Sequence, residues 1–324
     1  MRNSKLETRN SSGESRVPHD EPRTPDSELR ERHVPVLLRE VLEFLDVRPD
    51  GFYVDATLGA GGHAEAILRE LQRGRGRLLG VDRDPTALAL ARERLRAFGE
   101  RLTVTHGNFA EIDALHQASG LPPADGILAD LGLSSMQLED ASRGFSFSSP
   151  GPLDMRMDPQ SEITAEDFVN HGSERELADL IFKFGEERHS RQIARALMKA
   201  RPIRSTTELA QVVTRAIPSR SGLHQIHPAT RTFMALRLAV NREIENLDAF
   251  LGKALGVLAP GGRLVVLSFH SLEDRPVKRA FQAWQRDGRV RILTKKVVRP
   301  SEAEISTNPR SRSAKLRAAE KNRG

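Results

Sequence analysis

The sequence predicts an α/β fold, in which a mainly parallel sheet carries a helical segment inserted after its fourth strand. The first observation is an alternation of short apolar runs with helical patterns, which is typical of parallel strands joined by helices. The second is a glycine-rich turn, Gly59 to Gly62, followed by a helical pattern that starts near His63. The third is a stretch from about Ser142 to Gln225 with helical patterns and no strand signal. The expected strands lie near residues 52–57, 77–82, 102–107 and 125–131.

The N-terminal segment differs from the rest of the chain in composition. Residues 1 to 32 are rich in Ser, Arg, Glu, Asp and Pro and contain scarcely any bulky apolar residue. Such a segment buries too little apolar surface to offset the entropy of ordering, so we predict a disordered tail. Ordered structure is predicted to begin at His33, with a helix over Val36 to Leu45.

The glycine turn and the apolar run after it predict a nucleotide-type ligand. Glycine lets the backbone approach a ligand closely, and the free N–H groups at the start of a helix favour electron-rich ligand atoms. The second apolar run ends in Asp82, whose carboxylate can accept both hydroxyls of a ribose. Asp82 follows Gly61 by 82 − 61 = 21 residues, close to the ~20 expected for a ribose-binding acid.

Two cofactor classes use this geometry. Gly59 to Ala64 fits the G-x-G-x-x-A form of the dinucleotide fingerprint, so NAD stays a candidate. Asp55, just ahead of the glycines, favours S-adenosylmethionine (SAM), because a pyrophosphate gains nothing from an extra negative charge. SAM has no phosphate and carries a sulfonium cation and an ammonium group. The alternative interpretation is that Asp55 only caps a turn.

The fourth expected strand ends in a polar loop. Asp125 to Ser135 reads as a buried strand followed by the sequence Asp-Leu-Gly-Leu-Ser-Ser. Ligands of doubly wound sheets bind at this end of the strands. Amino-methyltransferases usually carry a pair of prolines and an aromatic residue here, and this chain lacks them, so their amine-binding mechanism does not transfer directly.

The second half of the chain indicates a sheet domain interrupted by an insertion. The clearest helical patterns of the insertion run from Ser173 to Lys183 and from Glu186 to Ala200. A long helical run is then predicted from Pro228 to Leu258, followed by a strand from Arg263 to Phe269 and a strand pair within Val290 to Val298. The predicted organisation is a sheet domain at 33–141 and 226–300, an inserted helical substrate-binding domain at 142–225 and a basic C-terminal tail at 301–324.

Motifs distributed over the chain are similar, in their order, to those of one family. They are His33 to Val41, Gly59 to His63, Asp82 to Pro85, Asp130 to Ser135, Arg143 to Phe147, Gly151 to Asp158, His227 to Phe233 and Ser268 to Arg275, with Asn308 to Ser313 near the end. The chain resembles the bacterial 16S ribosomal RNA (cytosine-N4)-methyltransferase family, RsmH or MraW, from residue 33 to residue 317. Such an ordered set is far more specific than one glycine loop.

The resemblance implies a Rossmann-like class I SAM-dependent methyltransferase sheet, SAM as the donor, and a cytidine in the decoding (P-site) region of 16S rRNA as the acceptor. Carried over by position, the cofactor contacts fall on Gly61, Gly62, His63, Asp82, Phe109, Asp130 and Gln137. Phe109 follows the third strand and could stack near the adenine, or be an ordinary core aromatic. Asn108 could bond the adenine edge or serve a turn. For His63 we expect a backbone contact rather than a role for the imidazole.

Asp130 is the first candidate for the catalytic group. Because the lone pair of the cytosine amine is delocalised into the ring, a methylase must orient the amine with acceptors and remove a proton. Asp130 ends the fourth strand, where the amine should meet the methyl group; the alternative is that it contacts only the cofactor. Ser134, with Ser135, is a second candidate, for holding the base.

Other aromatic and histidine side chains have less specific interpretations. Phe145 and Phe147 could flank a flipped base or lie in the core. His270, just past the fifth strand, could contact RNA or order its loop. His224 and His227 lack further ligands nearby in sequence, and we expect no metal site.

Composition limits the remaining possibilities. The 324 residues suffice for two modest domains, and the absence of cysteine excludes disulfides, thiolate nucleophiles and cysteine–zinc sites. No apolar run approaches the ~20 residues that span a bilayer, and no hydrophobic signal core is present, so we expect a cytoplasmic protein without membrane association. The net charge of +6, from 50 basic and 44 acidic residues, suits a polyanionic partner. A homodimer is compatible with the sequence.

Basic residues are concentrated in and near the insertion. We predict phosphate contacts for this cluster, and four of its members recur at helical spacing along one helix face, for which a solvated surface is the alternative. These four are Arg188, Arg191, Arg195 and Lys199; the others are Arg201, Arg204, Arg215, Arg220, Arg231 and Arg237, with Arg312, Lys315, Arg317 and Lys321 in the C-terminal tail.

Three hypotheses follow from these patterns. The first is a SAM-dependent methyltransferase that acts on 16S rRNA, within the small ribosomal subunit, and it is favoured by Asp55, Asp82 and the motif set. The second is an NAD-dependent oxidoreductase, which the Asp-Leu-Gly-Leu-Ser-Ser loop does not support. The third is a non-catalytic RNA-binding or assembly factor that keeps the fold.

Overall fold

A computed structural model describes residues 35–217 and 227–323. Residues 35–324 form one compact unit. The predicted tail at residues 1–32 lies outside the described residues, as do Arg220 and His224.

The described residues contain a mixed sheet in the order β3-β2-β1-β4-β5-β7-β6. All pairs from β3 to β5 are parallel, while β7 runs antiparallel to both β5 and β6. The strand order reverses between β1 and β4, so a ligand crevice is expected at the carboxyl ends of these strands. The bounds are β1 (Phe52–Asp55), β2 (Arg77–Asp82), β3 (Leu102–His106), β4 (Ala124–Asp130), β5 (Leu258–Ser268), β6 (Val290–Ile292) and β7 (Lys315–Lys321).

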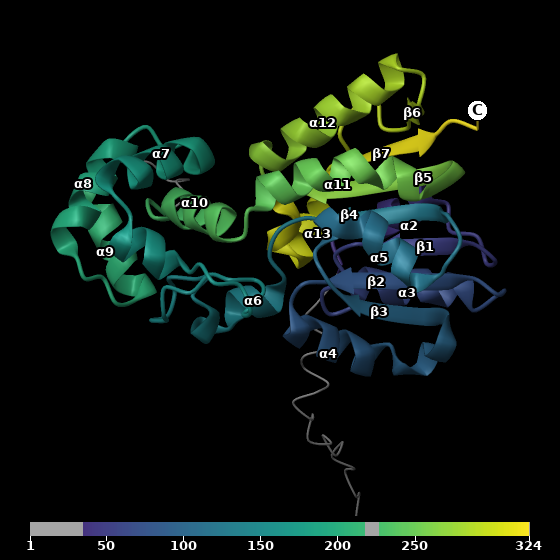
Figure 1. The fold of residues 1–324 in the computed structure, drawn as a ribbon, viewed down its shortest axis with the longest axis horizontal. Helices are drawn as coiled ribbons and strands as arrows, with labels where there is room; N and C mark the ends of the chain where they lie inside the picture. Colours follow the sequence, from purple (N-terminus) through teal and green to yellow (C-terminus); the bar gives the residue numbers. More distant parts are fainter. Residues whose placement is uncertain (1–34, 218–226, 324) are drawn as a thin grey trace, which may run out of the picture. The chain divides into compact units, whose positions relative to one another are not determined.

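Helices cover both faces of the sheet (Figure 1). Because successive side chains of a strand point to opposite faces, Val54 packs in one apolar cluster and its neighbour Tyr53 in another. The cluster around Val54 takes its helical residues from α5 (Ile112–Ser119), α11 (Glu243–Val257) and α12 (Ser271–Arg286). The cluster around Tyr53 takes them from α2 (Leu38–Leu45), α3 (Gly62–Leu71) and α4 (Pro85–Arg94). The strands and helices predicted for the first half of the chain are therefore present, with small differences at their ends.

The inserted segment builds a core of its own. It contains the short α6 (Ser135–Glu139) and then α7 (Glu174–Gly185), α8 (Ser190–Ala200) and α9 (Thr206–Ala216). Their apolar side chains pack with those of α10 (Thr230–Val240) in one cluster, and Figure 1 shows α7, α8, α9 and α10 grouped together. The helical run predicted from Pro228 is broken at Arg242, whose φ is +48°, so α10 packs with the inserted helices and α11 with the sheet.

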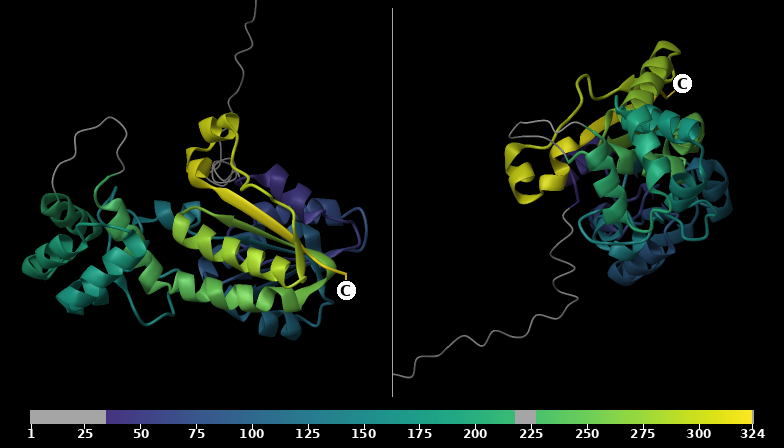
Figure 2. Two further views of the ribbon diagram at one scale, coloured as in Figure 1. Left: turned by 90° about the horizontal axis from the view of Figure 1, so that it is seen from above. Right: turned by 90° about the vertical axis from the view of Figure 1, so that its left-hand side faces the viewer.

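The C-terminal segment corrects one prediction. Residues 301–324 were expected as a basic tail, but they contain α13 (Glu302–Thr307) and β7, which Figure 2 draws in yellow. Strand β7 lies between β5 and β6 in the sheet. Of the strand pair expected within 290–298, only β6 forms a strand, and its partner is β7. Strand β7 alternates apolar and polar residues, so that Leu316 and Ala318 point into the core and are fully buried. The charged ends of Arg317 and Lys321 form hydrogen bonds to Asp274 and to the Leu255 carbonyl oxygen.

Candidate active site

The carboxyl ends of the parallel strands bring the predicted acids together. Asp55 ends β1, Asp82 ends β2 and Asp130 ends β4. The glycine turn lies between β1 and α3, directly beside them. Residues far apart in the sequence therefore meet at the crevice that the strand order predicts.

Asp82 is held by the backbone of two loops. Its Oδ2 accepts the Gly59 N–H at 2.7 Å and its Oδ1 accepts the Asp84 N–H at 2.9 Å. Burial raises the pKa of this carboxyl group. Each carboxylate oxygen offers about two acceptor positions, so both can still receive a hydroxyl group. This arrangement fits the predicted contact with a ribose.

Gly61 begins α3 in a conformation that favours glycine. Its φ is +81°, and a Cβ built there would lie 2.8 Å from Cδ1 of Leu95. Gly59 also has a positive φ, of +52°, but the nearest atom to its built Cβ is the Thr57 oxygen, 3.9 Å away. Packing and backbone conformation both require glycine at position 61. At position 59 only the backbone conformation favours glycine, and the space beside it is open.

Asp55 is almost fully buried, with 1% of its surface exposed. Its Oδ1 accepts the Thr57 N–H at 3.2 Å, so the capping role considered from the sequence is present. Burial raises the pKa of Asp55 to about 7, and the nearby Asp82 carboxylate adds to this effect. A cation in the crevice would therefore be stabilised by this group.

The pKa of Asp130 is raised further than that of Asp55. Its backbone N–H donates to the Thr57 hydroxyl at 2.7 Å, while its side-chain Oδ1 is buried without a hydrogen-bond partner. Burial, followed by the charges of Asp55 and Glu273, raises the pKa of Asp130 to about 8. A buried polar atom without a partner is rare in folded proteins. Oδ1 is therefore well suited to receive a donor from a ligand.

These three acids fit SAM rather than a pyrophosphate. Asp55 is buried, and Asp82 and Asp130 are partly buried. Such a cluster of carboxylates disfavours a phosphate, whereas sulfonium and ammonium groups would compensate its charge. Asp82 would hold the ribose, and Asp55 and Asp130 would face the cationic part. The electrostatic argument made from Asp55 thus extends to three residues.

The imidazole of His63 makes contacts within the protein, and the expected backbone contact of His63 with the cofactor stays a prediction. Its Nε2 lies 2.9 Å from the Val36 carbonyl oxygen, and its Nδ1 lies 3.6 Å from Oδ2 of Asp130. The side chain is 7% exposed. His63 therefore connects the segment before α2 with the end of β4.

Phe109 and Asn108 follow β3, as predicted. Phe109 is partly buried and packs edge-on against Phe250, with ring centroids 5.3 Å apart. Oδ1 of Asn108 accepts the Ala110 N–H at 3.0 Å, so Asn108 has the turn role. Contact of Phe109 with adenine stays a prediction.

Gln137 and Ser134 form a capping box at the start of α6. The Ser134 hydroxyl accepts the Gln137 N–H at 3.2 Å, and Oε1 of Gln137 accepts the Ser134 N–H at 3.1 Å. Nε2 of Gln137 donates to Oδ2 of Asp84 at 2.8 Å. Nε2 carries a second hydrogen, so the predicted cofactor contact of Gln137 is compatible with this network.

Asp84 and Arg143 stand within the family motifs of the sequence, but no role was assigned to either of them. Asp84 is 1% exposed and also accepts from Nη1 of Arg143 at 2.9 Å. Nη2 of Arg143 donates to the carbonyl oxygens of Arg156 and Met157, both at 2.9 Å. Asp84 stands before Pro85 as the N-cap of α4, and this cap signal could have identified it as a structural residue from the sequence.

Comparison with known proteins now decides the family. The model of the MraW methylase family matches residues 30–322. The chain belongs to the MraW methylase family. The relatives below agree with this assignment. Membership of a methylase family confirms the expected SAM-dependent methyltransferase with a Rossmann-like sheet, and it does not fit an NAD-dependent oxidoreductase.

Three curated relatives of this MraW family member carry the name ribosomal RNA small subunit methyltransferase H. The relative from Syntrophobacter fumaroxidans is 52% identical over 307 residues, which cover 89% of this chain and 96% of the relative. The relative from Dehalococcoides mccartyi is 50% identical over 304 residues, covering 89% and 86%. The relative from Koribacter versatilis is 52% identical over 295 residues, covering 89% and 93%.

In this MraW family member, a buried charged network lies beside the acids. Arg237 forms two bonds to the Glu243 carboxylate, at 2.8 and 3.0 Å, and Nη2 of Arg237 lies 3.7 Å from Glu273. His270 contacts Glu273 through Nε2 at 2.9 Å. Arg237 was predicted as a phosphate contact, but its side chain is 14% exposed and neutralises these carboxylates. His270 orders its loop, one of the two roles considered for it.

Other predicted basic contacts divide into engaged and exposed groups. Arg201 donates to the Val169 and Gly172 carbonyl oxygens, Arg317 pairs with Asp274, and Lys321 donates to the Leu255 and Leu258 carbonyl oxygens. These three stabilise the protein itself. Arg188, Arg191, Arg195 and Lys199 are exposed on and just before α8, and Arg195 lies 3.5 Å from Glu174.

The aromatic pair near the insertion is packed. Phe145 is buried in the core of the inserted helices. Phe147 contacts His227 and Phe233, with ring centroids 4.6 and 4.9 Å apart. Because Phe147 is only partly buried, its contact with a flipped base stays a prediction.

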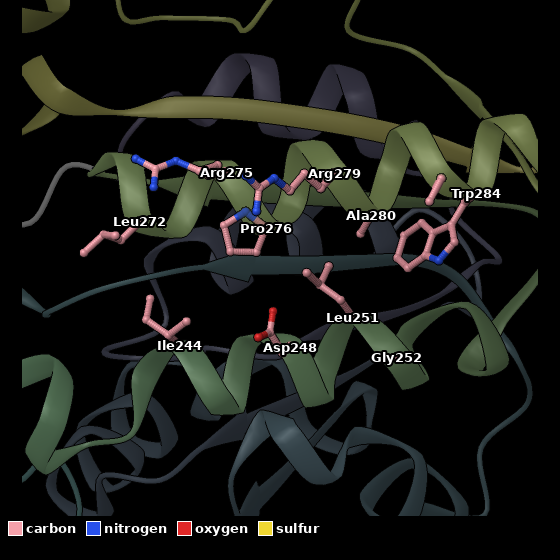
Figure 3. Close-up of a pocket in the computed structure, with 11 residues that line it drawn as sticks. Ile244, Asp248, Leu251, Gly252, Leu272, Arg275, Pro276, Arg279, Ala280 and Trp284 are labelled. Carbon is pink, nitrogen blue, oxygen red and sulfur yellow. The ribbon is translucent and has the colours of Figure 1, made fainter. Parts of the chain in front are cut away.

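A groove between α11 and α12 lies apart from these residues. It has a volume of about 570 Å³ and is lined by apolar and charged residues of the two helices, among them Asp248, Arg279 and Trp284 (Figure 3). None of the predicted cofactor residues lines it. Within residues 35–217 and 227–323, no group of side chains could hold a metal ion, and no helix could cross a membrane.

Proposed function

We propose that this chain transfers the methyl group of SAM to the exocyclic N4 amine of a cytidine in the decoding (P-site) region of 16S rRNA. The observation that carries the proposal is the buried, unpartnered Oδ1 of Asp130 at the ligand end of β4. An amine needs such an acceptor. The names of the relatives support an acceptor in small-subunit ribosomal RNA.

Binding of the cofactor is assigned to the strand ends and the loops beside them. Asp82 would accept the ribose hydroxyls, and Asp55 would compensate the cationic groups. When bound, SAM supplies an electrophilic methyl group. The full proposed set is Gly61, Gly62, His63, Asp82, Phe109, Asp130 and Gln137.

Asp130 would orient the acceptor amine and relay its proton. A hydrogen bond from the amine to Oδ1 turns the nitrogen lone pair out of conjugation and towards the methyl carbon. Such orientation at a separation of roughly 3 Å supplies a large share of the rate. The Ser134 hydroxyl oxygen accepts a hydrogen bond as the cap of α6, so its hydrogen stays available to hold the base.

The acceptor base would leave its stack to reach this buried centre. Flipping a base out of its stack costs a few kcal/mol, and this cost is lowest for unpaired RNA. The exposed basic face of α8 would bind phosphates and position the strand without reading its sequence. We propose the small ribosomal subunit as the partner, and the site is compatible with either a monomer or a homodimer in the cytoplasm.

The test is transfer of radiolabelled methyl from SAM to small subunits that lack the modification, followed by nucleoside analysis. Label in N4-methylcytidine is the expected result, and a parallel reaction on free 16S rRNA shows whether the assembled subunit is required. Label in another nucleoside would assign a different acceptor. Absence of label, despite SAM binding, would favour the non-catalytic RNA-binding alternative.

The Asp130→Ala variant tests the role of the carboxyl group. We expect loss of transfer even at SAM concentrations that saturate the variant; the Kd for SAM is measured on the same variant, because Asp130 also belongs to the proposed cofactor set. Unchanged turnover would overturn the assignment of Asp130, because the amine would then have another acceptor.

A further inference from the structure

We infer that His63 is a positioning residue for methyl transfer: the positive charge of its protonated imidazole, which lies beside the Asp130 carboxyl group, keeps Asp130 ionised when the amine arrives. The inference rests on the proposed function, because it concerns the state of the proposed amine acceptor. It assigns the imidazole a role beyond contact with the cofactor.

The hydrogen-bond geometry fixes which ring nitrogen titrates. Nε2 lies 2.9 Å from the Val36 carbonyl oxygen. A carbonyl oxygen only accepts, so Nε2 must carry a hydrogen in either charge state of the ring. Nδ1 is then the nitrogen that gains or loses the proton, and it faces Oδ2 of Asp130 at 3.6 Å.

The position of His63 is set by α3. It is the second residue of the helix that Gly61 caps, and its side chain is almost fully buried. Burial and the Val36 contact hold the ring in one orientation. The pair is therefore a fixed arrangement between α3 and the end of β4.

The other charges around Asp130 make a proton on His63 favourable. Asp55 from β1 and Glu273 from α12 are both acids, and both raise the pKa of Asp130. The cationic Arg237 of α10 is bound to Glu243 of α11 and lies beside Glu273, and His270 is also bound to Glu273. An imidazolium at His63 supplies the positive charge that the Asp130 carboxylate needs.

The two oxygens of Asp130 would then have separate tasks. Oδ2 stays with His63, while the unpartnered Oδ1 meets the amine. The nitrogen–carbon bond forms as the carbon–sulfur bond breaks, and sulfur keeps that electron pair. The surplus proton on nitrogen passes to Oδ1 and is released to water afterwards, which returns the pair to its starting state.

The pH dependence of kcat in His63→Gln tests the inference. Glutamine keeps an N–H that can reach the Val36 carbonyl but cannot hold the proton. Burial and the neighbouring acids raise the pKa of Asp130, and loss of a stabilising positive charge would raise it further. One pKa unit lowers the ionised fraction about tenfold at a pH well below the pKa. We therefore expect kcat of the variant to fall up to about tenfold at neutral pH and to recover towards the wild-type value at alkaline pH.

A loss of the same size at every pH would overturn the inference, because a merely structural role of His63 does not depend on the ionisation of Asp130. The Kd for SAM, measured on the same variant, shows whether the cofactor site is intact. The wild-type enzyme is the control for the reaction. If it methylates no RNA, the proposed function fails, and the inference is judged by the next measurement alone.

That measurement is an NMR titration of the His63 ring nitrogens in the wild-type protein without RNA. We expect Nε2 to stay protonated throughout and Nδ1 to titrate. In Asp130→Asn the midpoint of His63 should fall by about one pH unit, because the anionic neighbour is lost. An unchanged midpoint, or a proton on Nδ1 only, would overturn the inference even if His63→Gln does not fold.

Discussion

The buried carboxylate of Asp84 accepts a hydrogen bond from the side-chain amide of Gln137 at 2.8 Å. This bond joins the loop after β2 to the first turn of α6. Asp82 is the last residue of β2, and Ser134 caps α6. Arg143 donates to the same carboxylate and extends the connection to the backbone at Met157. The cofactor side and the acceptor side of the site thus share one buried acid.

Asp84→Ala is expected to destabilise the protein strongly. The substitution removes the cap of α4 and leaves Arg143 and Gln137 without their acceptor in a buried site. Losing one partner of such a pair costs about 3 kcal/mol. Urea unfolding measures the change in the free energy of unfolding.

Asp179→Ala is the matched control for Asp84, because Asp179 also pairs with an arginine, Arg175, but both side chains are exposed. We expect no measurable change in its unfolding free energy. Equal effects of the two substitutions would contradict the role assigned to burial.

Asp55→Asn is expected to change how stability depends on pH. The pKa of Asp55 is about 7 in the folded protein, against 3.8 for the unperturbed group. Between these values the folded state holds a proton that the unfolded chain has lost, so the free energy of unfolding falls as pH rises. The slope from one such group is at most about 1.4 kcal/mol per pH unit.

In Asp55→Asn this contribution is absent, so the stability curve between about pH 4 and pH 7 should be flatter than that of the wild type. The measurement is urea unfolding without SAM at several pH values in that window. Parallel curves for the two proteins would show that Asp55 ionises at its ordinary pKa.

Asp82→Asn is expected to weaken SAM binding by about 10- to 100-fold, because a hydrogen bond to a charged group contributes roughly 1.5–3 kcal/mol. Calorimetry gives the Kd, and thermal stabilisation by SAM but not by NAD checks the choice of cofactor. Asp125→Asn is the matched control. Asp125 also accepts a backbone N–H, that of Phe52 at 2.9 Å, but it lies at the opposite end of the strands. Equal weakening in both variants would indicate a general effect on the sheet.

Replacing Arg191 and Lys199 on α8 with glutamine should weaken RNA binding and make it less dependent on salt. Each lost phosphate contact lowers the slope of log K against log salt by about 1. The measurement is RNA affinity at several salt concentrations. Arg69→Gln with Arg73→Gln is the control with the same change in charge, since both residues are exposed but lie on or just after α3. An equal change of slope in the control would point to net charge rather than to the α8 face.

Several interactions of the site could not be predicted from local patterns. Arg237 and Arg188 look alike in the sequence, yet Arg237 is buried against two glutamates and Arg188 is exposed. The difference depends on tertiary contacts, because Arg237 on α10 meets Glu243 of α11 and Glu273 of α12. In the same way, β7 reads as a basic tail, because its lysines and arginines conceal a buried face that only pairing with β5 reveals.

Local sequence patterns were enough to predict the parallel strands, the glycine turn, Asp55, Asp82 and Asp130, and the family motifs, because apolar periodicity and turn chemistry act between near neighbours in the chain. Three features became visible in the folded protein alone: Asp84 joins β2 to α6, His63 faces Asp130, and the C-terminal strand completes the sheet. Each of these depends on contacts between residues distant in sequence, and burial alone decides which charged groups must find a partner.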